Sequence, residues 1–212
     1  MPMISTTHRT GPASSACLAL FAVAMLTLAG PAPAAPVSDP AAQRVDAFDQ
    51  ALLAAMKEGS AGSARARARR LTAPLEQSFD LPTMTQFSVG PAWSTMSEAQ
   101  HRELIGAFTR FSVASYAHNF DSYSGQRFEI TGVQVRGPDR IVQVRLISPH
   151  DAPVSLIYRM RPAGGGWKII DIYFDNISQL TTRRADFAAS LAKGGAAGLL
   201  AHLEALTVKL LG

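Results

Sequence analysis

The side chains that could do chemistry in this chain are few and scattered. Beyond residue 34, histidines occur at His101, His118, His150 and His202. None has a second histidine or a carboxylate at the spacing that places two metal ligands on one helix face. His101 and His118 fall several turns apart on one predicted helix, so they cannot share a site, and we interpret them as solvated helix residues. The sequence therefore predicts no metal site.

Asp171 is the acid that interrupts an otherwise apolar predicted strand. In a hollow α+β fold, an isolated acid facing the hollow could be a general base with a raised pKa. The simpler interpretation is an ion pair with an arginine of a neighbouring strand, Arg159 or Arg145, and we favour it. The catalytic role stays open as the alternative.

Other chemical motifs are missing from the sequence. There is no nucleophile elbow, phosphate loop or dinucleotide-binding glycine motif, and the single cysteine, Cys17, lies in the N-terminal apolar run. A basic cluster is spread around one predicted helix, which is typical of a solvated surface; the alternative is an orienting contact with anionic lipid headgroups or an acidic partner. The cluster consists of Arg65, Arg67, Arg69 and Arg70.

Residues 1–34 have the features of a secretory signal peptide. Arg9 precedes an apolar run over 17–30, and Ala32 and Ala34 form a small-residue cleavage site. We expect cleavage after Ala34, a periplasmic location, and a single domain over residues 35–212. The formal net charge of +4 is too small to indicate nucleic-acid binding.

Helices are predicted on both sides of a group of strands. Apolar spacing and capping residues place the first three helices at about 40–58, 64–78 and 80–90, and a capping box at Ser97 begins a long amphipathic helix. After the strands, we expect helices at about 177–192 and, beyond two glycines, 197–211.

The strands follow one another with short turns. Alternating apolar residues start after Gly125, and the phase of alternation changes at Gly132, where a bulge would bend the strand. In the fourth strand, 167–174, alternation places Ile170 and Ile172 opposite Asp171. The sequence therefore predicts an α+β fold: a bent antiparallel meander of about four strands, with helices before and after it.

Apolar side chains of the strands and of the long helix face one another in this fold. They could form an ordinary packed core or line a ligand cavity, and composition does not separate the two.

Two stretches of the sequence resemble the MlaC family, the periplasmic phospholipid-binding components of lipid-transport ABC systems, also called the toluene-tolerance auxiliary family. The first stretch carries Phe79, Asp80, Leu81, Pro82, Thr83, Met84, Gly90, Pro91, Ala92, Trp93, Ser97, Glu98, Ala99, Gln100, Phe108, Phe111, Tyr116 and Tyr123. The second carries Trp167, Lys168, Ile169, Ile170, Asp171, Asn176, Ile177, Ser178, Arg184 and Phe187. The end of the chain is similar to HpnM, a hopanoid-associated branch of the family.

The resemblance implies a carrier without catalytic residues or cofactors, which holds a phospholipid or a hopanoid in an apolar cavity. It further implies exchange with an inner-membrane ABC transporter complex and an outer-membrane partner, with only transient membrane contact. The ligand-binding residues predicted on this basis are Phe108, Phe111, Tyr116, Phe128, Val133, Val142, Val144, Leu146, Leu156, Tyr158, Ile170 and Ile172.

Two other functions remain open. One is a small enzyme on an NTF2-like or cystatin-like cone, using Asp171 and a tyrosine. The other is a non-binding adaptor of an ABC transport system, which would have a filled core.

Overall fold

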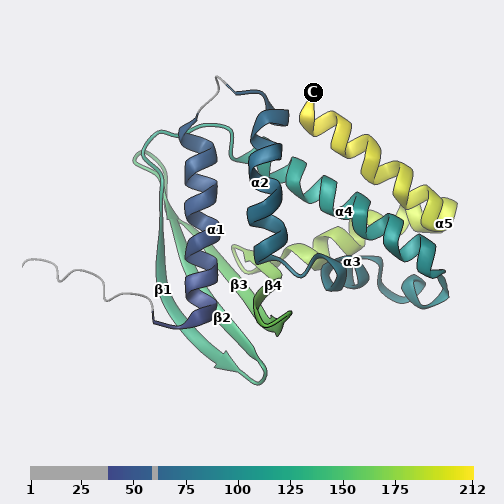
Figure 1. Cartoon of the computed structure of the whole chain (residues 1–212), viewed down its shortest axis with the longest axis horizontal. Coiled ribbons are helices and arrows are strands. Elements are labelled where there is room, and N and C mark those ends of the chain that lie inside the picture. The colour runs from purple at the N-terminus through teal and green to yellow at the C-terminus, as the bar shows by residue number, and fades with distance from the viewer. Residues whose placement is uncertain (1–37, 59–61) are drawn as a thin grey trace, which may run out of the picture. The chain divides into compact units, whose positions relative to one another are not determined.

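The computed structural model describes residues 38–58 and 62–212, all within the compact unit Pro36–Gly212. The signal peptide predicted over 1–34, with its cleavage site, lies outside the described residues. The predicted α+β class is confirmed, because helices precede and follow the strands of one antiparallel sheet along the chain (Figure 1). The elements are α1 (Pro40–Lys57), α2 (Ala64–Ser78), α3 (Leu81–Val89), a 3-10 helix η1 (Gly90–Thr95), α4 (Glu98–Asn119), β1 (Arg127–Arg136), β2 (Asp139–Ile147), β3 (Val154–Ala163), β4 (Gly166–Phe174), β5 (Ile177–Ser178) and α5 (Gln179–Leu211).

The sheet is a meander with strand order β1-β2-β3-β4-β5. Its first bulge lies between Ile130 and Gly132, where the change of phase predicted it. The short strand β5 was not predicted, because only two residues pair with the end of β4.

A second bulge, which the sequence did not reveal, lies in the β3–β4 ladder. Arg159 pairs with Asp171 and Met160 pairs with Ile169, so Ile170 is the extra residue of β4. Ile169 and Ile172 therefore share the face that packs on the helices, and Ile170 does not. The alternation predicted for this strand is wrong at Ile169 and Ile170, because a bulge shifts the phase of every residue on one side of it.

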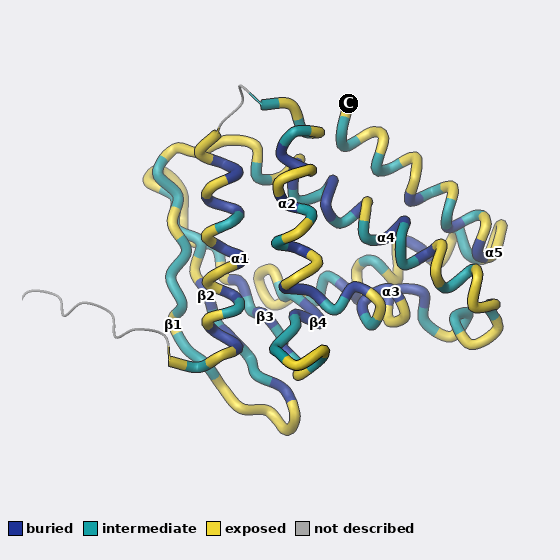
Figure 2. Tube along the Cα trace, in the orientation of Figure 1, coloured by how far each residue is buried: buried dark blue, intermediate teal, exposed yellow. Residues whose placement is uncertain are grey.

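Helix α1 covers one part of the sheet and contacts β1, β2 and β4. Asp39 accepts a hydrogen bond from the Ala41 amide and Pro40 takes the first helical position, so the sequence fixes where the helix begins. Buried and exposed residues alternate along the helix in Figure 2, as expected for an amphipathic helix. Its buried face joins the core of the domain.

Helix α4 packs between α2 and α5, and α3 also packs against α5. The capping box predicted at Ser97 is present: the Gln100 amide donates to the Ser97 hydroxyl and the Gln100 side chain accepts from the Ser97 amide. This fixes the start of the helix that forms one wall of the pocket described below.

The two helices predicted at the end of the chain are present as the two segments of α5. They meet at Gly195, whose φ of 56° and ψ of −145° suit glycine alone. Beyond the break the chain returns on itself, and a Cβ on Gly198 would lie 2.8 Å from the Ser190 carbonyl oxygen. By length and composition α5 is, in the part of the chain that the structure describes, the one helix that could span a membrane. The break leaves two segments that each fall short of the ~20 residues a span needs, and α3 and α4 pack against them.

Candidate ligand-binding site

A pocket of about 250 Å³ opens between the covered face of β3 and β4 and the helices α4 and α5. We call it the α4–α5 pocket. No residue of α1, β1 or β2 lines it. Its lining consists of Phe79, Met84, Phe111, Ser112, Ser115, Tyr116, Asn119, Phe120, Leu156, Tyr158, Ile172, Phe174, Gln179, Leu180 and Arg183.

The sheet side of the pocket is apolar. Two cross-strand pairs of β3 and β4 supply it: Leu156 opposite Phe174, and Tyr158 opposite Ile172. Because cross-strand partners point to the same face of a sheet, these four side chains form one continuous surface.

Aromatic side chains of α4 face this apolar surface. The rings of Tyr116 and Phe120, one helical turn apart, stack with centroids 5.7 Å apart. The Phe79 ring, at the end of α2, meets the Tyr116 ring edge-on at 5.8 Å. These contacts give the helix side of the pocket a cluster of packed aromatic rings.

Polar side chains of α4 and α5 also line the pocket: Ser112, Ser115 and Asn119 on α4, and Gln179 and Arg183 on α5. Arg183 is the one charged residue among the described residues of the lining. The pocket is therefore amphipathic: its sheet side is apolar, and its helices contribute both aromatic and polar groups.

The Arg183 guanidinium lies over the Phe111 ring, with its central carbon 4.8 Å from the ring centroid. Partial burial lowers the pKa of Arg183, and nearby Asp186 acts in the opposite direction. The Asp186 carboxylate is 3.6 Å away, which is too long for a hydrogen bond. An arginine remains protonated in proteins, so the pocket lining carries a fixed positive charge.

A buried acid lies beside the pocket lining. The Tyr158 hydroxyl donates a 3.0 Å hydrogen bond to Asp49 of α1, whose side chain is 1 % exposed. The other carboxylate oxygen of Asp49 has no partner among the described residues. Burial raises the pKa of Asp49 to about 8, although the Tyr158 hydrogen bond lowers it.

Desolvation also raises the pKa of Tyr158, and Asp49 adds to that rise. Sequence reasoning missed Asp49, although a signal was present. Asp49 lies four residues after Val45 and three before Leu52, on the apolar stripe of α1.

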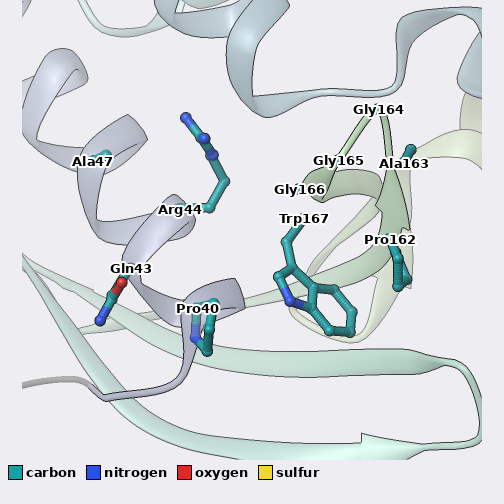
Figure 3. A pocket seen from close by; sticks show the side chains of 10 residues that line it. All are labelled: Pro40, Gln43, Arg44, Ala47, Pro162, Ala163, Gly164, Gly165, Gly166 and Trp167. Carbon is teal, nitrogen blue, oxygen red and sulfur yellow. The ribbon is translucent and has the colours of Figure 1, made fainter.

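Two further pockets are lined differently. An open groove of about 810 Å³ lies between the start of α1 and the β3–β4 turn, with Trp167, Arg44 and the turn glycines around it (Figure 3). A groove of about 350 Å³ on the other face of the sheet holds Phe87, Ile170 and Arg184. Of these three we select the α4–α5 pocket, because it joins side chains of the sheet and of both α4 and α5 around an apolar surface.

Comparison with known proteins identifies the family. The family model described as MlaC protein matches residues 46–205 of the chain. The chain belongs to the MlaC family. Proteins of this family bind lipids and are not enzymes, which argues against the catalytic alternative.

A solved structure shares the fold. It is a phospholipid-binding protein from Ralstonia solanacearum, determined in complex with a phospholipid. The two chains are 22% identical and superimpose with a TM-score of 0.72, over 82% of this chain and 100% of the other. The MlaC-like α+β fold is thus seen in both.

The residues predicted to bind ligand divide into those that line the α4–α5 pocket and those that do not. Those that line the α4–α5 pocket are Phe111, Tyr116, Leu156, Tyr158 and Ile172. Sequence reasoning missed the rest of the lining, including Phe79, Phe120, Phe174 and Arg183. Some of these lie one helical turn or one alternation step from predicted members, which is the signal that could have found them.

The other predicted residues do not line the pocket. Phe108 packs its ring against Phe187 at 6.3 Å, and Val142 and Val144 are fully buried in the core. Ile170 faces the opposite side of the sheet because of the β4 bulge. The remaining ones are half-buried against the core: Phe128, Val133 and Leu146.

The ion pair predicted for Asp171 is wrong. Its carboxylate accepts hydrogen bonds from the Ile172 amide at 2.8 Å, the Leu180 amide at 3.2 Å and the Ser178 hydroxyl at 2.6 Å. These partners tie β4 to the first turn of α5, where unpaired amides attract a carboxylate. Asp171 thus holds α5 in place.

The arginines predicted for Asp171 bind other acids. Arg159 and Arg161 both donate to Asp139, at 2.6 and 2.7 Å, and Arg145 lies 3.5 Å from Glu129. Burial works against ionisation of Asp139, but the hydrogen bonds from the two arginines outweigh it and its pKa is lowered.

Two further residues differ from their predicted solvated state. The His101 ring stacks on Trp93, with centroids 3.9 Å apart, and its Nε2 lies 2.9 Å from the Trp93 carbonyl oxygen. Arg67 is buried and donates to the carbonyl oxygens of Ala117 and Gly62 at 2.8 and 2.6 Å.

Within residues 38–58 and 62–212, no cluster of His, Cys, Asp or Glu could hold a metal ion.

Proposed function

We propose that this protein is a periplasmic phospholipid carrier that binds its ligand in the α4–α5 pocket. The observation that carries the proposal is the amphipathic lining: apolar and aromatic side chains from β3, β4 and the helices, beside polar groups and one cation on α4 and α5. A phospholipid has the same division between acyl chains and headgroup. The phospholipid bound to the Ralstonia solanacearum protein supports the choice of ligand.

The physical need for a carrier supports transport as the role. Exposing one CH₂ group to water costs about 0.8 kcal/mol, so a 16-carbon chain costs about 12 kcal/mol. Spontaneous release into water would be very slow, and a carrier must pass its lipid directly to a docked partner. We infer exchange with an inner-membrane ABC transporter complex and an outer-membrane partner, with only transient membrane contact.

The periplasm is the compartment in which such a carrier is needed, and it is the location of the MlaC family. The signal peptide predicted over 1–34, cut after Ala34, would bring the protein there. The intact mass of protein from the periplasm tests the cleavage site, and retention of Cys17 would contradict it.

The volume of the pocket adds a condition. At about 250 Å³ it is smaller than the ~300–1,000 Å³ typical of ligand pockets. A diacyl lipid therefore requires α4 and α5 to separate from the sheet, or part of a chain to leave past the exposed Phe174. The loaded protein should thus be more expanded around this pocket than the structure described above.

Native mass spectrometry of gently purified protein tests the proposal, with lipid extraction to identify the ligand. We expect one phospholipid per chain, and uptake from phospholipid vesicles after delipidation. Lipid-free spectra without uptake would favour the adaptor role. Loading with hopanoids and not phospholipids would place the protein in the hopanoid-associated branch and overturn the phospholipid assignment.

A further inference from the structure

We propose that Arg183 binds the phosphate of the lipid and makes the α4–α5 pocket selective for phosphate-bearing lipids over uncharged ones. This inference rests on the proposed function and adds the residue that would determine the class of ligand. The starting point is the charge distribution: Arg183 is the one charged residue among the described residues lining this pocket.

The position of Arg183 suits a phosphate. Its side chain is 32% exposed, so the guanidinium is neither in the core nor free in water. The cation–π contact with the Phe111 ring, 4.8 Å from the guanidinium carbon to the ring centroid, favours this position of the guanidinium. A preorganised planar fork binds phosphate oxygens through two parallel hydrogen bonds, which a flexible cation does less well.

The hydrogen-bonding capacity of Arg183 is largely unused. Its contact with Asp186, at 3.6 Å between nitrogen and oxygen, does not occupy a donor at hydrogen-bond distance. Ser112 and Asn119, which also line the pocket, likewise make no side-chain hydrogen bond to any described residue. These donors lie on α4 and α5, away from the apolar sheet side. A lipid whose chains lie on Leu156 and Ile172 would direct its phosphate toward the helices that carry Arg183.

Arg110 provides a matched control. Arg110 lies on α4, the helix that also carries Phe111, and its side chain is exposed. Its guanidinium nitrogen lies 3.7 Å from the carboxylate of Glu204 on α5. It does not line the pocket. Arg110→Gln therefore removes one positive charge near α5 without changing the proposed phosphate site.

The experiment varies the protein and the ligand together. Delipidated wild type, Arg183→Gln, Arg183→Lys and Arg110→Gln are equilibrated with vesicles carrying labelled phosphatidylethanolamine, or labelled diacylglycerol with the same acyl chains. The headgroup of phosphatidylethanolamine has no net charge, so long-range attraction of the protein to the vesicle is the same for both lipids. The bound lipid per chain gives the partition constant, and thermal melting of each lipid-free variant checks the fold.

We expect Arg183→Gln to lower the partition of phosphatidylethanolamine roughly ten- to a hundredfold, as for loss of a hydrogen-bonded charged group. The partition constant of Arg183→Gln for diacylglycerol should change less than about twofold. Diacylglycerol has no phosphate to lose, and the small change is of the size seen for sites that do not interact. Arg183→Lys should fall between, because it keeps the charge and loses the fork. Arg110→Gln should bind both lipids like wild type.

Two results would overturn the inference. An equal loss of both lipids in Arg183→Gln would mean that Arg183 acts only through its packing against the Phe111 ring and does not bind the phosphate. No loss of either lipid would mean that the phosphate lies elsewhere. If wild type itself took up neither lipid, the proposed function would fail before the role of Arg183 arose.

Discussion

Val144 and Leu156 are cross-strand partners on β2 and β3, and they point to the same face of the sheet. Val144 is 1% exposed and belongs to the packed core, whereas Leu156 lines the α4–α5 pocket. The boundary between filled interior and hollow therefore runs between two neighbouring strands. The covered face of the sheet is not one cavity, and its two parts have different roles.

The helices above the two parts explain the difference. Helix α1 contacts β1, β2 and β4, and its buried face includes the small residues Ala41, Ala42 and Val45. Next to β3 and β4, the residues of α4 that line the pocket include Ser112 and Asn119. Their polar side chains do not pack into the space beside the apolar sheet residues. Close packing produces stability in one part, and its interruption leaves room for a ligand in the other.

Asp49 lies where the two parts meet, and its substitution should give the largest change. In the unfolded chain this carboxyl loses its proton near pH 4, whereas in the fold it keeps the proton up to about pH 8. The stabilising contribution of the protonated group is present below pH 4 and is lost as pH rises through 8. A shift of this size corresponds to an upper bound on the order of 5 kcal/mol.

We expect Asp49→Asn to be more stable than wild type at pH 9 and nearly equal to it at pH 4, because Asn keeps the acceptor for Tyr158. Urea unfolding at both pH values measures this. Asp46→Asn, at an exposed position of the same helix, should retain most of the wild-type pH dependence, because the Asp46 charge is the smallest of the three causes that shift the pKa of Asp49. Parallel pH profiles for wild type and Asp49→Asn would contradict the burial of this acid.

Tryptophan substitutions at the two partner positions come next. Val144→Trp should destabilise the lipid-free protein by about 1–3 kcal/mol, because it overpacks a filled core. Leu156→Trp should cost less than about 1 kcal/mol, because the added ring enters the pocket. Thermal melting of both delipidated variants beside wild type measures the difference. Similar melting temperatures for the two variants would contradict the proposal that the packed core ends and the pocket begins between β2 and β3.

The start of α4 should show an effect on stability alone. Ser97→Ala removes one half of the capping box and should cost about 1 kcal/mol. Because Ser97 lies on an exposed turn away from the pocket lining, lipid content should not change. Urea unfolding and lipid extraction together check this. A loss of lipid would show that the pocket depends on small changes in helix stability.

Sequence reasoning predicted the elements and the meander well, because their signals are local. The bulge at Gly132 was predictable since the apolar residues change phase there. The bulge at Ile170 was not, because the run from Ile169 to Ile172 is apolar on both faces apart from Asp171, and no change of phase is visible.

The extent of the pocket was not predictable for a different reason. Val144 and Leu156 are both apolar residues at alternating positions, and the helix that lies above each depends on packing between distant segments. Arg183 could not be placed in the pocket for the same reason, since the turn of α5 toward β4 depends on the hydrogen bonds of Asp171.

Phospholipid content of Leu156→Trp and Val144→Trp tests the central claim most directly, namely that the α4–α5 pocket holds the lipid. Both variants and wild type are purified gently, and native mass spectra count the phospholipid bound to each folded chain. The account predicts one phospholipid on wild type, little or none on Leu156→Trp, and near wild-type occupancy on the folded fraction of Val144→Trp. Full occupancy of Leu156→Trp, with loss confined to Val144→Trp, would place the lipid under α1 and contradict it.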